Sequence, residues 1–280
     1  MTGYANPGSL IDTEWLALHL TDPGIAIIEV DEDTTAYDKG HIPGAVALDW
    51  EHDLRAAPRR DFISADELGA LLGARGISAE KTIVLYGGNN NWFAAYAYWL
   101  FRMRGVEKLQ LLDGGRKKWE LESRALDTEH PARAAKTFRM GLARPGIRIF
   151  RDEVVARAFS GAMMVDVRSP AEFTGEMLAP PHLPQEQPQV PGHIPGASNI
   201  PWSKAANEDG SFKSADDLRA LYEGAKILPT GEVVTYCRIG ERSSHTWFVL
   251  TELLGYPGVR NYDGSWTEYG SLVNVPVEVG

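Results

Sequence analysis

An internal duplication constrains this chain more than any other feature of its sequence. The sequence SADEL at residues 64–68 recurs as SADDL at residues 214–218, an offset of 150 positions. Upstream, HIPGA at residues 41–45 recurs unchanged at residues 193–197. The offset of 150 also matches four single residues: Tyr86 with Tyr236, Leu100 with Leu250, Gly105 with Gly255, and Asp113 with Asp263. A spacing that holds along most of each half predicts two homologous domains.

Short apolar runs alternate with helical patterns in both halves. The runs are bounded by turns and are typical of buried parallel strands: residues 25–30, 82–86, 163–167 and 233–236. Ser64 followed by Glu67 forms a capping box, which predicts that a helix begins there. The apolar run at residues 92–101 predicts a buried helix, since it is about half of the ~20 residues needed to span a bilayer. This alternation predicts an α/β fold of two tandem domains, each with a central, mostly parallel sheet flanked by helices.

The composition between the two repeats indicates where the domains end. Residues 126–147 lack a clear period and contain several Ala, Arg and Pro residues, which predicts a linker. We therefore expect a first domain at residues 1–125 and a second at residues 148–280. The second half carries an insertion at residues 178–188, whose prolines predict a loop packed over the surface.

Composition and charge exclude several classes of protein. The chain has one cysteine in 280 residues, so neither an internal disulfide nor a zinc site of paired cysteines can form. Its 28 basic and 38 acidic side chains give a net charge of −10, which opposes general binding to nucleic acid or to an anionic membrane. Residues 1–9 have neither the basic nor the apolar region of a secretory signal, so we expect a cytoplasmic protein. The duplication also allows a monomer, because two domains can cover each other as two subunits would.

The lone cysteine lies in a segment that differs between the repeats. Cys237 follows a predicted buried strand and begins the sequence CRIGER at residues 237–242, after which a helical pattern starts. The backbone N–H groups of such a loop, at the carboxyl end of a parallel strand, can converge on an anion. With Arg238 and Arg242 nearby, we expect Cys237 to be a thiolate at neutral pH. The first repeat has Gly87 at the matching position, which suggests that it has lost the nucleophile.

Plainer interpretations of these residues stay open. Cys237 can be a small buried apolar residue, which is the common fate of an isolated cysteine. Arg238 and Arg242 can be solvated surface arginines, and Arg238 in particular can point away from the loop. Arg242, next to the helix start, is the better candidate for binding a ligand.

Together these segments resemble the rhodanese family of sulfurtransferases, in particular its tandem-domain thiosulfate sulfurtransferases of actinobacterial type. The resemblance covers nearly the whole chain and rests on five features: the tandem repeat, the two HIPGA turns, DVR at residues 166–168, CRIGER at residues 237–242, and DGSW at residues 263–266. It implies a catalytic second domain with Cys237 as the nucleophile and a non-catalytic first domain. It also implies that no metal or organic cofactor is required.

The resemblance implies a two-step transfer of sulfur. The Cys237 thiolate takes the sulfane sulfur of thiosulfate, a small anionic donor, and releases sulfite; the persulfide then passes its outer sulfur to cyanide or a cellular thiol. The expected substrate-binding residues are Arg242, Arg238 and Arg168. For Arg168 a second interpretation has equal weight, namely that it pairs with an acid in the core.

The chain also departs from the better-known family members. It has Ile239 and Glu172 where the vertebrate thiosulfate enzymes have basic residues, so those substrate contacts do not carry over. Glu241 adds a negative charge to the loop, which weakens binding of a dianion unless it pairs with Arg238 or Arg168. Relatives that prefer 3-mercaptopyruvate have Gly-Ser-Gly after the cysteine, and its absence here favours thiosulfate.

Three alternative functions follow from the same residues. The first is a 3-mercaptopyruvate sulfurtransferase, and the second is a persulfide carrier that serves a protein acceptor. The third is a cysteine phosphatase, but those enzymes have five residues between cysteine and arginine, whereas four separate Cys237 from Arg242. The shorter loop makes a smaller cradle, which suits one sulfur atom better than a phosphoryl group.

Other candidate residues are expected to be structural. His41 and His193 occupy the same turn in both repeats, which favours a structural role, with a functional role for His41 as the alternative. Asp263 is expected to cap a helix that begins near Ser265.

Overall fold

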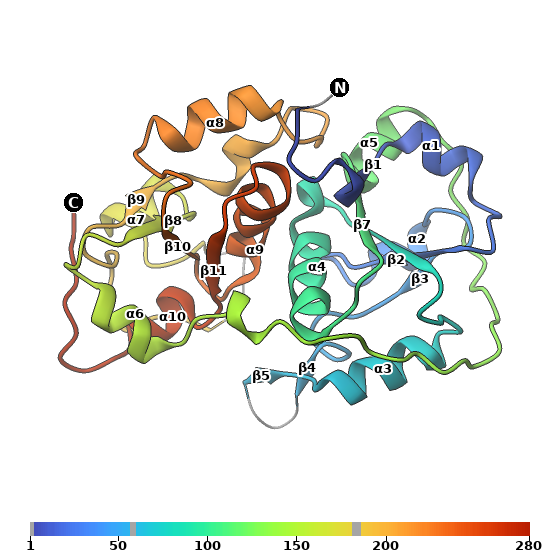
Figure 1. The fold of residues 1–280 in the computed structure, drawn as a ribbon, viewed down its shortest axis with the longest axis horizontal. Coiled ribbons are helices and arrows are strands. Elements are labelled where there is room, and N and C mark those ends of the chain that lie inside the picture. The colour runs from blue at the N-terminus through green and yellow to red at the C-terminus, as the bar shows by residue number, and fades with distance from the viewer. Residues whose placement is uncertain (1–2, 57–59, 181–185) are drawn as a thin grey trace. The chain divides into compact units, whose positions relative to one another are not determined.

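The computed structural model describes residues 3–56, 60–180 and 186–280. The chain divides into two units, both drawn in Figure 1. The first unit comprises Gly8–Pro145 with the short segment Ala206–Phe212, and the second comprises Gly146–Ala205 and Lys213–Gly280 with the N-terminal residues up to Pro7. Each unit contains one copy of the repeat.

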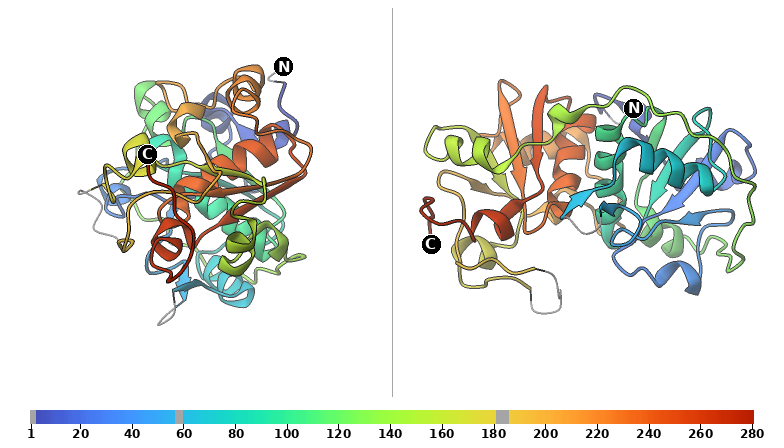
Figure 2. Two further views of the ribbon diagram at one scale, coloured as in Figure 1. Left: turned by 90° about the vertical axis from the view of Figure 1, so that its left-hand side faces the viewer. Right: turned by 90° about the horizontal axis from the view of Figure 1, so that it is seen from below.

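A parallel sheet of five strands forms the centre of the first unit. Its strands are β1 Leu10–Ile11, β2 Ile25–Glu29, β3 Val46–Ala47, β6 Thr82–Tyr86 and β7 Leu109–Leu112, while β4 Arg55–Ala56 and β5 Asp61–Phe62 pair separately and antiparallel. The helices are α1 Thr13–Leu18, α2 Ala36–Lys39, α3 Ala65–Ala74, α4 Trp92–Arg104 and α5 Gly115–Leu121. The strand order is β1-β7-β6-β2-β3 with every neighbouring pair parallel, and helices lie on both faces of the sheet (Figures 1 and 2).

The second unit is built in the same way around a parallel sheet of four strands. Its strands are β8 Met163–Asp166, β9 Ser198–Asn199, β10 Glu232–Tyr236 and β11 Gly258–Tyr262. The helices are α6 Arg151–Arg157, α7 Pro170–Thr174, α8 Ala215–Glu223, α9 Glu241–Phe248 and α10 Ser265–Tyr269, and α9 continues as a π-helical segment over Val249–Leu253. The strand order is β11-β10-β8-β9, again with parallel neighbours.

These elements confirm the predicted fold class. The four predicted strands correspond to β2, β6, β8 and β10, with bounds that differ by at most one residue. The capping box of Ser64 and Glu67 is present at the start of α3. The apolar run at residues 92–101 lies in α4 and is buried along its whole length, as expected.

The two units repeat one interaction at the end of the central strand. Tyr86 ends β6 and Tyr236 ends β10, and both side chains are fully buried. The Tyr86 hydroxyl accepts a hydrogen bond from Ile42 N–H at 3.0 Å, and the Tyr236 hydroxyl accepts one from Ile194 N–H at 3.1 Å. Each bond joins the HIPGA turn to the strand that precedes position 87 or 237. The carboxyl end of the central strand is therefore held in the same way in both units.

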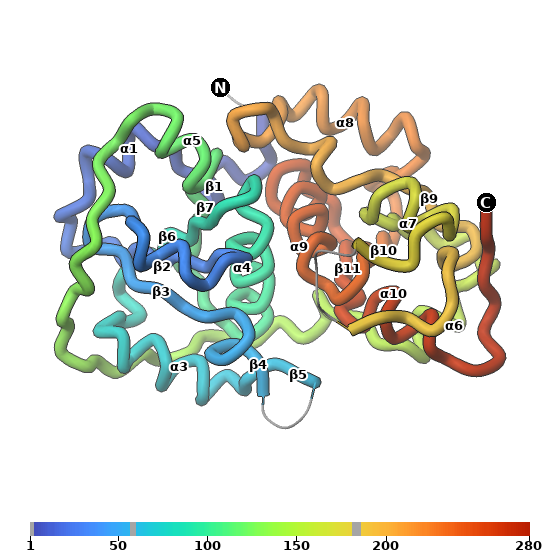
Figure 3. The backbone as a smooth tube through the Cα atoms, turned by 180° about the vertical axis from the view of Figure 1, so that it is seen from behind, coloured from blue at the N-terminus to red at the C-terminus, as the bar shows by residue number. Residues whose placement is uncertain are grey.

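The predicted linker lies along the surface of the first unit, as the green part of the tube in Figure 3. Lys136 N–H donates to Gly73 O at 2.9 Å, and Gly141 N–H donates to Gly105 O at 2.9 Å. A Cβ atom at Gly73 would overlap the Lys136 carbonyl oxygen. The missing side chain on α3 therefore lets the linker backbone lie directly against this helix.

The predicted surface loop of the insertion falls partly outside the described residues, because it includes residues 181–185. Beyond that gap, Gln189 and Val190 N–H both donate to Gly270 O, at 3.2 and 3.1 Å. Trp266 Nε1 donates to Val190 O at 3.1 Å. The two residues that follow the insertion are thus fixed to α10 and to Gly270 at its end.

Candidate active site

Cys237 lies between the carboxyl end of β10 and the start of α9. Its side chain is fully buried, and Gly240 N–H donates to Cys237 Sγ at 3.1 Å. Gly240 has a φ of +101°, and a Cβ atom there would lie 2.7 Å from Asp263 Cα. Glycine is therefore required for the turn that directs a backbone N–H at the sulfur.

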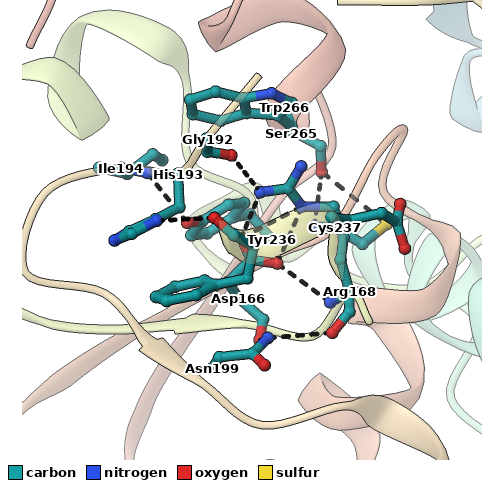
Figure 4. Close-up of polar contacts among 12 residues, drawn as sticks. Asp166, Arg168, Gly192, His193, Ile194, Asn199, Tyr236, Cys237, Ser265 and Trp266 are labelled. Carbon is teal, nitrogen blue, oxygen red and sulfur yellow. Dashed lines mark hydrogen bonds and ion pairs between the residues drawn. The ribbon is translucent and has the colours of Figure 1, made fainter. Parts of the chain in front are cut away.

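The backbone of Cys237 is held by the start of α10. Cys237 N–H donates to Ser265 Oγ at 3.0 Å, and Trp266 N–H donates to Cys237 O at 3.0 Å. Ser265 Oγ also lies 4.0 Å from Cys237 Sγ (Figure 4). Ser265 was not among the site residues predicted from the sequence, although it stands in the DGSW motif.

Arg242 is bound to a buried carboxylate. Its Nη1 and Nη2 donate to Glu172 Oε2 and Oε1, each at 2.8 Å, and the side chains are 7% and 0% exposed. Burial alone would lower the pKa of Arg242, but the hydrogen bonds and charge of Glu172 raise it. The charge of Arg242 also interacts with Cys237. Arg242 is thus a buried cation within electrostatic range of Cys237, with its paired donors already engaged by Glu172.

Glu172 is positioned by a second capping box. Ser169 N–H and Oγ donate to Glu172 Oε2 at 3.1 and 2.9 Å, and Glu172 N–H donates to Ser169 Oγ at 3.3 Å. Burial would raise the pKa of Glu172, but the hydrogen bonds and charge of Arg242 outweigh burial and lower it to about 2. From the sequence, Glu172 was noted only as a departure from relatives that have a basic residue there, and its pair with Arg242 was not predicted. The S-P-A-E pattern at residues 169–172 was an available signal for the capping box, but not for the pair with Arg242.

Arg168 pairs with an acid in the core, which is the second of its two interpretations. Its Nε donates to Asp166 Oδ1 at 3.0 Å, and its Nη2 donates to Asp166 Oδ2 at 2.6 Å. Nη2 also donates to Gly192 O at 2.8 Å (Figure 4). The guanidinium lies over the Trp266 ring, 4.9 Å from its centroid. Since Arg168 is 1% exposed, these contacts account for its buried charge.

The first unit contains a matching pair without a cysteine beside it. Glu29 in β2 corresponds to Asp166 in β8, because both lie in register with the tyrosine that ends the central strand. Glu29 binds Arg116, which takes the position of Trp266 in the repeat. The guanidinium thus comes from a different element in each unit. A pair that persists where the cysteine is absent favours a structural role for Arg168.

Arg238 is buried rather than solvated. It is 2% exposed, and its Nε donates to Glu186 O, at the end of the insertion, at 3.0 Å. Burial and the nearby charge of Arg242 lower the pKa of Arg238, and its charge interacts with Cys237 and Glu241. Arg238 and Arg242 are therefore both brought within electrostatic range of Cys237, and Glu241 is buried at the start of α9.

The loop of the first unit is closed by its own side chains. Gly87 N–H donates to Asn91 Oδ1 at 3.0 Å, and Asn91 Nδ2 donates to Leu112 O at 2.5 Å. A Cβ atom at Gly87 would overlap the carbonyl oxygen of Val30. This loop therefore has no room for a cysteine side chain.

The two histidines of the HIPGA turns make matching contacts. The His41 ring stacks on the Tyr37 ring with their centroids 3.7 Å apart, and His41 Nδ1 lies 2.9 Å from Tyr37 O. His193 stacks on Phe173 at 3.6 Å, and its Nδ1 lies 2.9 Å from Phe173 O. These contacts fasten each turn to the preceding helix and support the structural interpretation of both residues.

The expectation that Asp263 caps α10 is wrong. Arg148 Nε and Nη2 donate to the two Asp263 carboxylate oxygens at 2.7 and 2.9 Å. The residue before α10 is Gly264, which makes no side-chain capping bond. The Asp263 carboxylate binds the charged Arg148 guanidinium instead, because a charged donor binds a carboxylate more strongly than a neutral backbone N–H does.

Two further properties concern only residues 3–56, 60–180 and 186–280. Within these ranges, no group of three or more His, Cys, Asp or Glu side chains is placed to hold a metal ion. Within the same ranges, no helix combines the length and the apolar character that a membrane span requires.

Comparisons with known proteins extend over both units. A family model described as "Rhodanese-like domain" matches residues 12–122 and 151–272. A Mycolicibacterium smegmatis protein named "Putative thiosulfate sulfurtransferase" is 58% identical over 97% of this chain and 98% of its own length. A Thermus thermophilus protein named "Sulfur carrier protein TtuD" is 51% identical over 99% of both chains. The crystal structure of YnjE has a TM-score of 0.83 at 26% identity and covers 97% of this chain and 68% of that one.

Proposed function

Because the chain belongs to the rhodanese family, we propose that it is a thiosulfate sulfurtransferase that carries sulfur on Cys237. The family and the relatives support a rhodanese-type sulfurtransferase. The observation that carries the assignment of Cys237 is the bond from Gly240 N–H to Sγ at 3.1 Å. A backbone donor fixed at a sulfur atom favours its anionic, nucleophilic form.

The first step moves sulfur from thiosulfate to the enzyme. The Cys237 thiolate attacks the sulfane sulfur, and a new bond forms between Sγ and that atom. The sulfur–sulfur bond of thiosulfate breaks, and its electron pair leaves with sulfite. The negative charge of the attacking thiolate passes to the departing sulfite, and the sulfane sulfur keeps its own negative charge, so no proton has to be transferred.

The second step returns the enzyme to its thiolate form. A nucleophilic acceptor, either cyanide or a thiolate, attacks the outer sulfur of the Cys237 persulfide. The bond between the two sulfur atoms breaks, and its electron pair returns to Cys237 Sγ. The products with cyanide are thiocyanate and the free thiolate, and neither step requires a metal or an organic cofactor.

The cationic residues have separate roles in this proposal. Arg238 and Arg242 would attract the anionic donor, because the charge of each interacts with Cys237. Glu172 engages both Nη atoms of Arg242. Arg242 would therefore act more by its charge than by a paired contact with the sulfonate of thiosulfate. For Arg168, the pair with Asp166 favours a role in holding the end of β8.

The domains would divide the work unequally. We assign catalysis to residues 148–280 and a non-catalytic role to residues 1–125, with residues 126–147 as the linker. The closed loop around Gly87 and Asn91 supports this division, because it offers neither a nucleophile nor space for a donor.

Turnover with thiosulfate and cyanide tests the proposed function. We expect sulfite and thiocyanate in equal amounts over many turnovers, and none from the Cys237→Ser variant. Turnover with 3-mercaptopyruvate alone would move the assignment to that donor. Hydrolysis of an aryl phosphate without any sulfur transfer would count against the whole proposal.

The relative named as a sulfur carrier supports a second candidate function. In this alternative, Cys237 loads sulfur in the same first step and delivers it to a protein acceptor. A carrier would form the persulfide once and retain it in the presence of cyanide or small thiols. Release of one equivalent of sulfite without further turnover would therefore favour the carrier.

A further inference from the structure

Ser265 adopts a backbone conformation that serine rarely takes. Its φ is +52°, in the left-handed region, and its side chain is fully buried. The matching residue of the first unit is Gly115, with a φ of +54°. Glycine enters this region without the steric penalty of a Cβ atom, so the second unit keeps a serine where glycine is the unstrained residue. Strain that is retained beside a reactive group points to a function.

The hydroxyl of Ser265 is placed to serve both the backbone and the sulfur of Cys237. It accepts a hydrogen bond from Cys237 N–H at 3.0 Å and donates to Tyr262 O at 2.7 Å. Its oxygen also lies 4.0 Å from Cys237 Sγ (Figure 4). A hydroxyl has one proton and two lone pairs. It can therefore keep the bond from Cys237 N–H while its proton turns from the carbonyl to the sulfur.

The first unit satisfies the equivalent backbone N–H in a different way. Gly87, the counterpart of Cys237, donates its N–H to Asn91 Oδ1 at 3.0 Å, so the amide group lies within the loop. A Cβ atom at Gly115 would overlap Asn91 Oδ1. A side chain at position 115 would therefore occupy the space of the Asn91 amide. The first unit can contain one or the other, but not both.

We propose that Ser265 is a positioning residue for sulfur transfer. It holds Cys237 from outside the loop, so that no other side chain has to enter the loop to satisfy the Cys237 N–H. Its hydroxyl turns toward Sγ when Cys237 is in its anionic form, and the proton stays on the Ser265 oxygen throughout. This inference rests on the proposed role of Cys237 as the sulfur-carrying residue.

Two variants separate the hydroxyl from the backbone strain. Ser265→Gly and Ser265→Ala both remove the hydroxyl, but only the glycine also relieves the left-handed φ. We expect both variants to slow persulfide formation at saturating thiosulfate by about tenfold or more, the effect of losing one hydrogen bond to a charged atom. The half-saturating thiosulfate concentration should stay within about twofold of wild type, because Ser265 acts on sulfur and not on the sulfonate. Ser265→Gly should nevertheless resist urea better than Ser265→Ala.

A matched control isolates the effect of left-handed strain. Ser123 is an exposed serine of the first unit with a φ of +53°. Ser123→Gly should increase resistance to urea and leave the rate of persulfide formation at the wild-type value. The proposal is overturned if the rate of persulfide formation instead depends on the backbone strain. In that case Ser265→Gly, which relieves the strain, would form the persulfide as fast as wild type.

A donor-independent measurement separates this inference from the proposed function. Alkylation of Cys237 by iodoacetamide requires the reactive sulfur but no thiosulfate, and we expect the same slowing in both Ser265 variants. Slowed alkylation with no sulfur uptake by the wild-type protein would refute thiosulfate as donor and leave the role of Ser265 intact. Unchanged alkylation in both variants would refute the role of Ser265.

Discussion

Glu172 holds Arg242 in a bidentate ion pair, with both donor–acceptor distances at 2.8 Å, beside the loop that carries Cys237. The pair joins α7 to the first turn of α9, and neither side chain is more than 7% exposed. Removing one partner of a buried pair leaves an uncompensated charge in a poorly solvated place. The position of the loop therefore depends on a residue far from Cys237 in the sequence.

Replacing Glu172 tests how strongly this pair holds the fold. Glu172→Gln keeps the shape of the side chain but removes its charge, so we expect the free energy of unfolding to fall by about 3 kcal/mol. Urea denaturation at neutral pH measures the change. Glu176→Gln is the matched control, because Glu176 is an exposed glutamate nearby, and it should change stability by less than about 0.5 kcal/mol. Equal stability of the two variants would contradict the account.

The same pair predicts a dependence of stability on pH. The pKa of Glu172 is lowered from 4.5 to about 2 in the folded protein, as Arg242 outweighs the effect of burial. The folded state therefore binds fewer protons than the unfolded state between these values, and stability falls as the pH drops from 4.5 toward 2. Urea midpoints measured from neutral to acidic pH should fall less steeply for Glu172→Gln than for wild type. Parallel curves would show that Glu172 does not titrate in this way.

The loop of the first unit should not accept a cysteine. A Cβ atom at Gly87 would overlap the Val30 carbonyl oxygen, so we expect Gly87→Cys to lower the free energy of unfolding by at least about 2 kcal/mol. In a Cys237→Ser background, Gly87→Cys should take up no sulfur from thiosulfate. The control is Gly146→Ala, because nothing lies within 4 Å of a Cβ atom there. Sulfur on a cysteine at position 87 would show that the loop can open.

The contact between the linker and α3 gives a further prediction. Alanine has a higher helix propensity than glycine, by about 1 kcal/mol, so Gly73→Ala would stabilise an isolated helix. In the protein, the new Cβ atom would overlap the Lys136 carbonyl oxygen, and we expect a net loss of stability. Gly69→Ala should be milder, since its Cβ atom would lie 3.1 Å from Phe138 O. Urea denaturation and limited proteolysis of the linker would measure both effects. A stabilised Gly73→Ala variant would contradict the observed packing.

Much of the fold could be predicted from local patterns. The strands β6 and β10 are short, apolar and bounded by turns, and both appear within one residue of their expected bounds. The start of α9 was predicted less accurately. The helical pattern was recognised from Ser243, but the helix begins at Glu241. Gly240 makes the turn with a positive φ, and the polar residues that follow it do not show the apolar period.

Contacts between residues distant in the sequence limited the prediction of the site. Glu172 and Arg242 lie 70 positions apart, so no local period reveals their pairing. Asp263 was expected to cap α10 because a short polar residue before a helix usually does so. Arg148, 115 positions away, binds its carboxylate instead. Cys237 could be selected because the strand, the loop and the helix that surround it are contiguous in the sequence.

The most direct test of the account is the mass of the intact protein after incubation with thiosulfate, followed by mapping of the modified peptide. We predict that the wild-type protein gains one sulfur atom on the peptide that contains Cys237, and that cyanide then removes it. The Cys237→Ser variant should keep its original mass. A wild-type protein that gains no sulfur, or a Cys237→Ser variant that gains as much as wild type, would contradict the central claim that Cys237 carries the transferred sulfur.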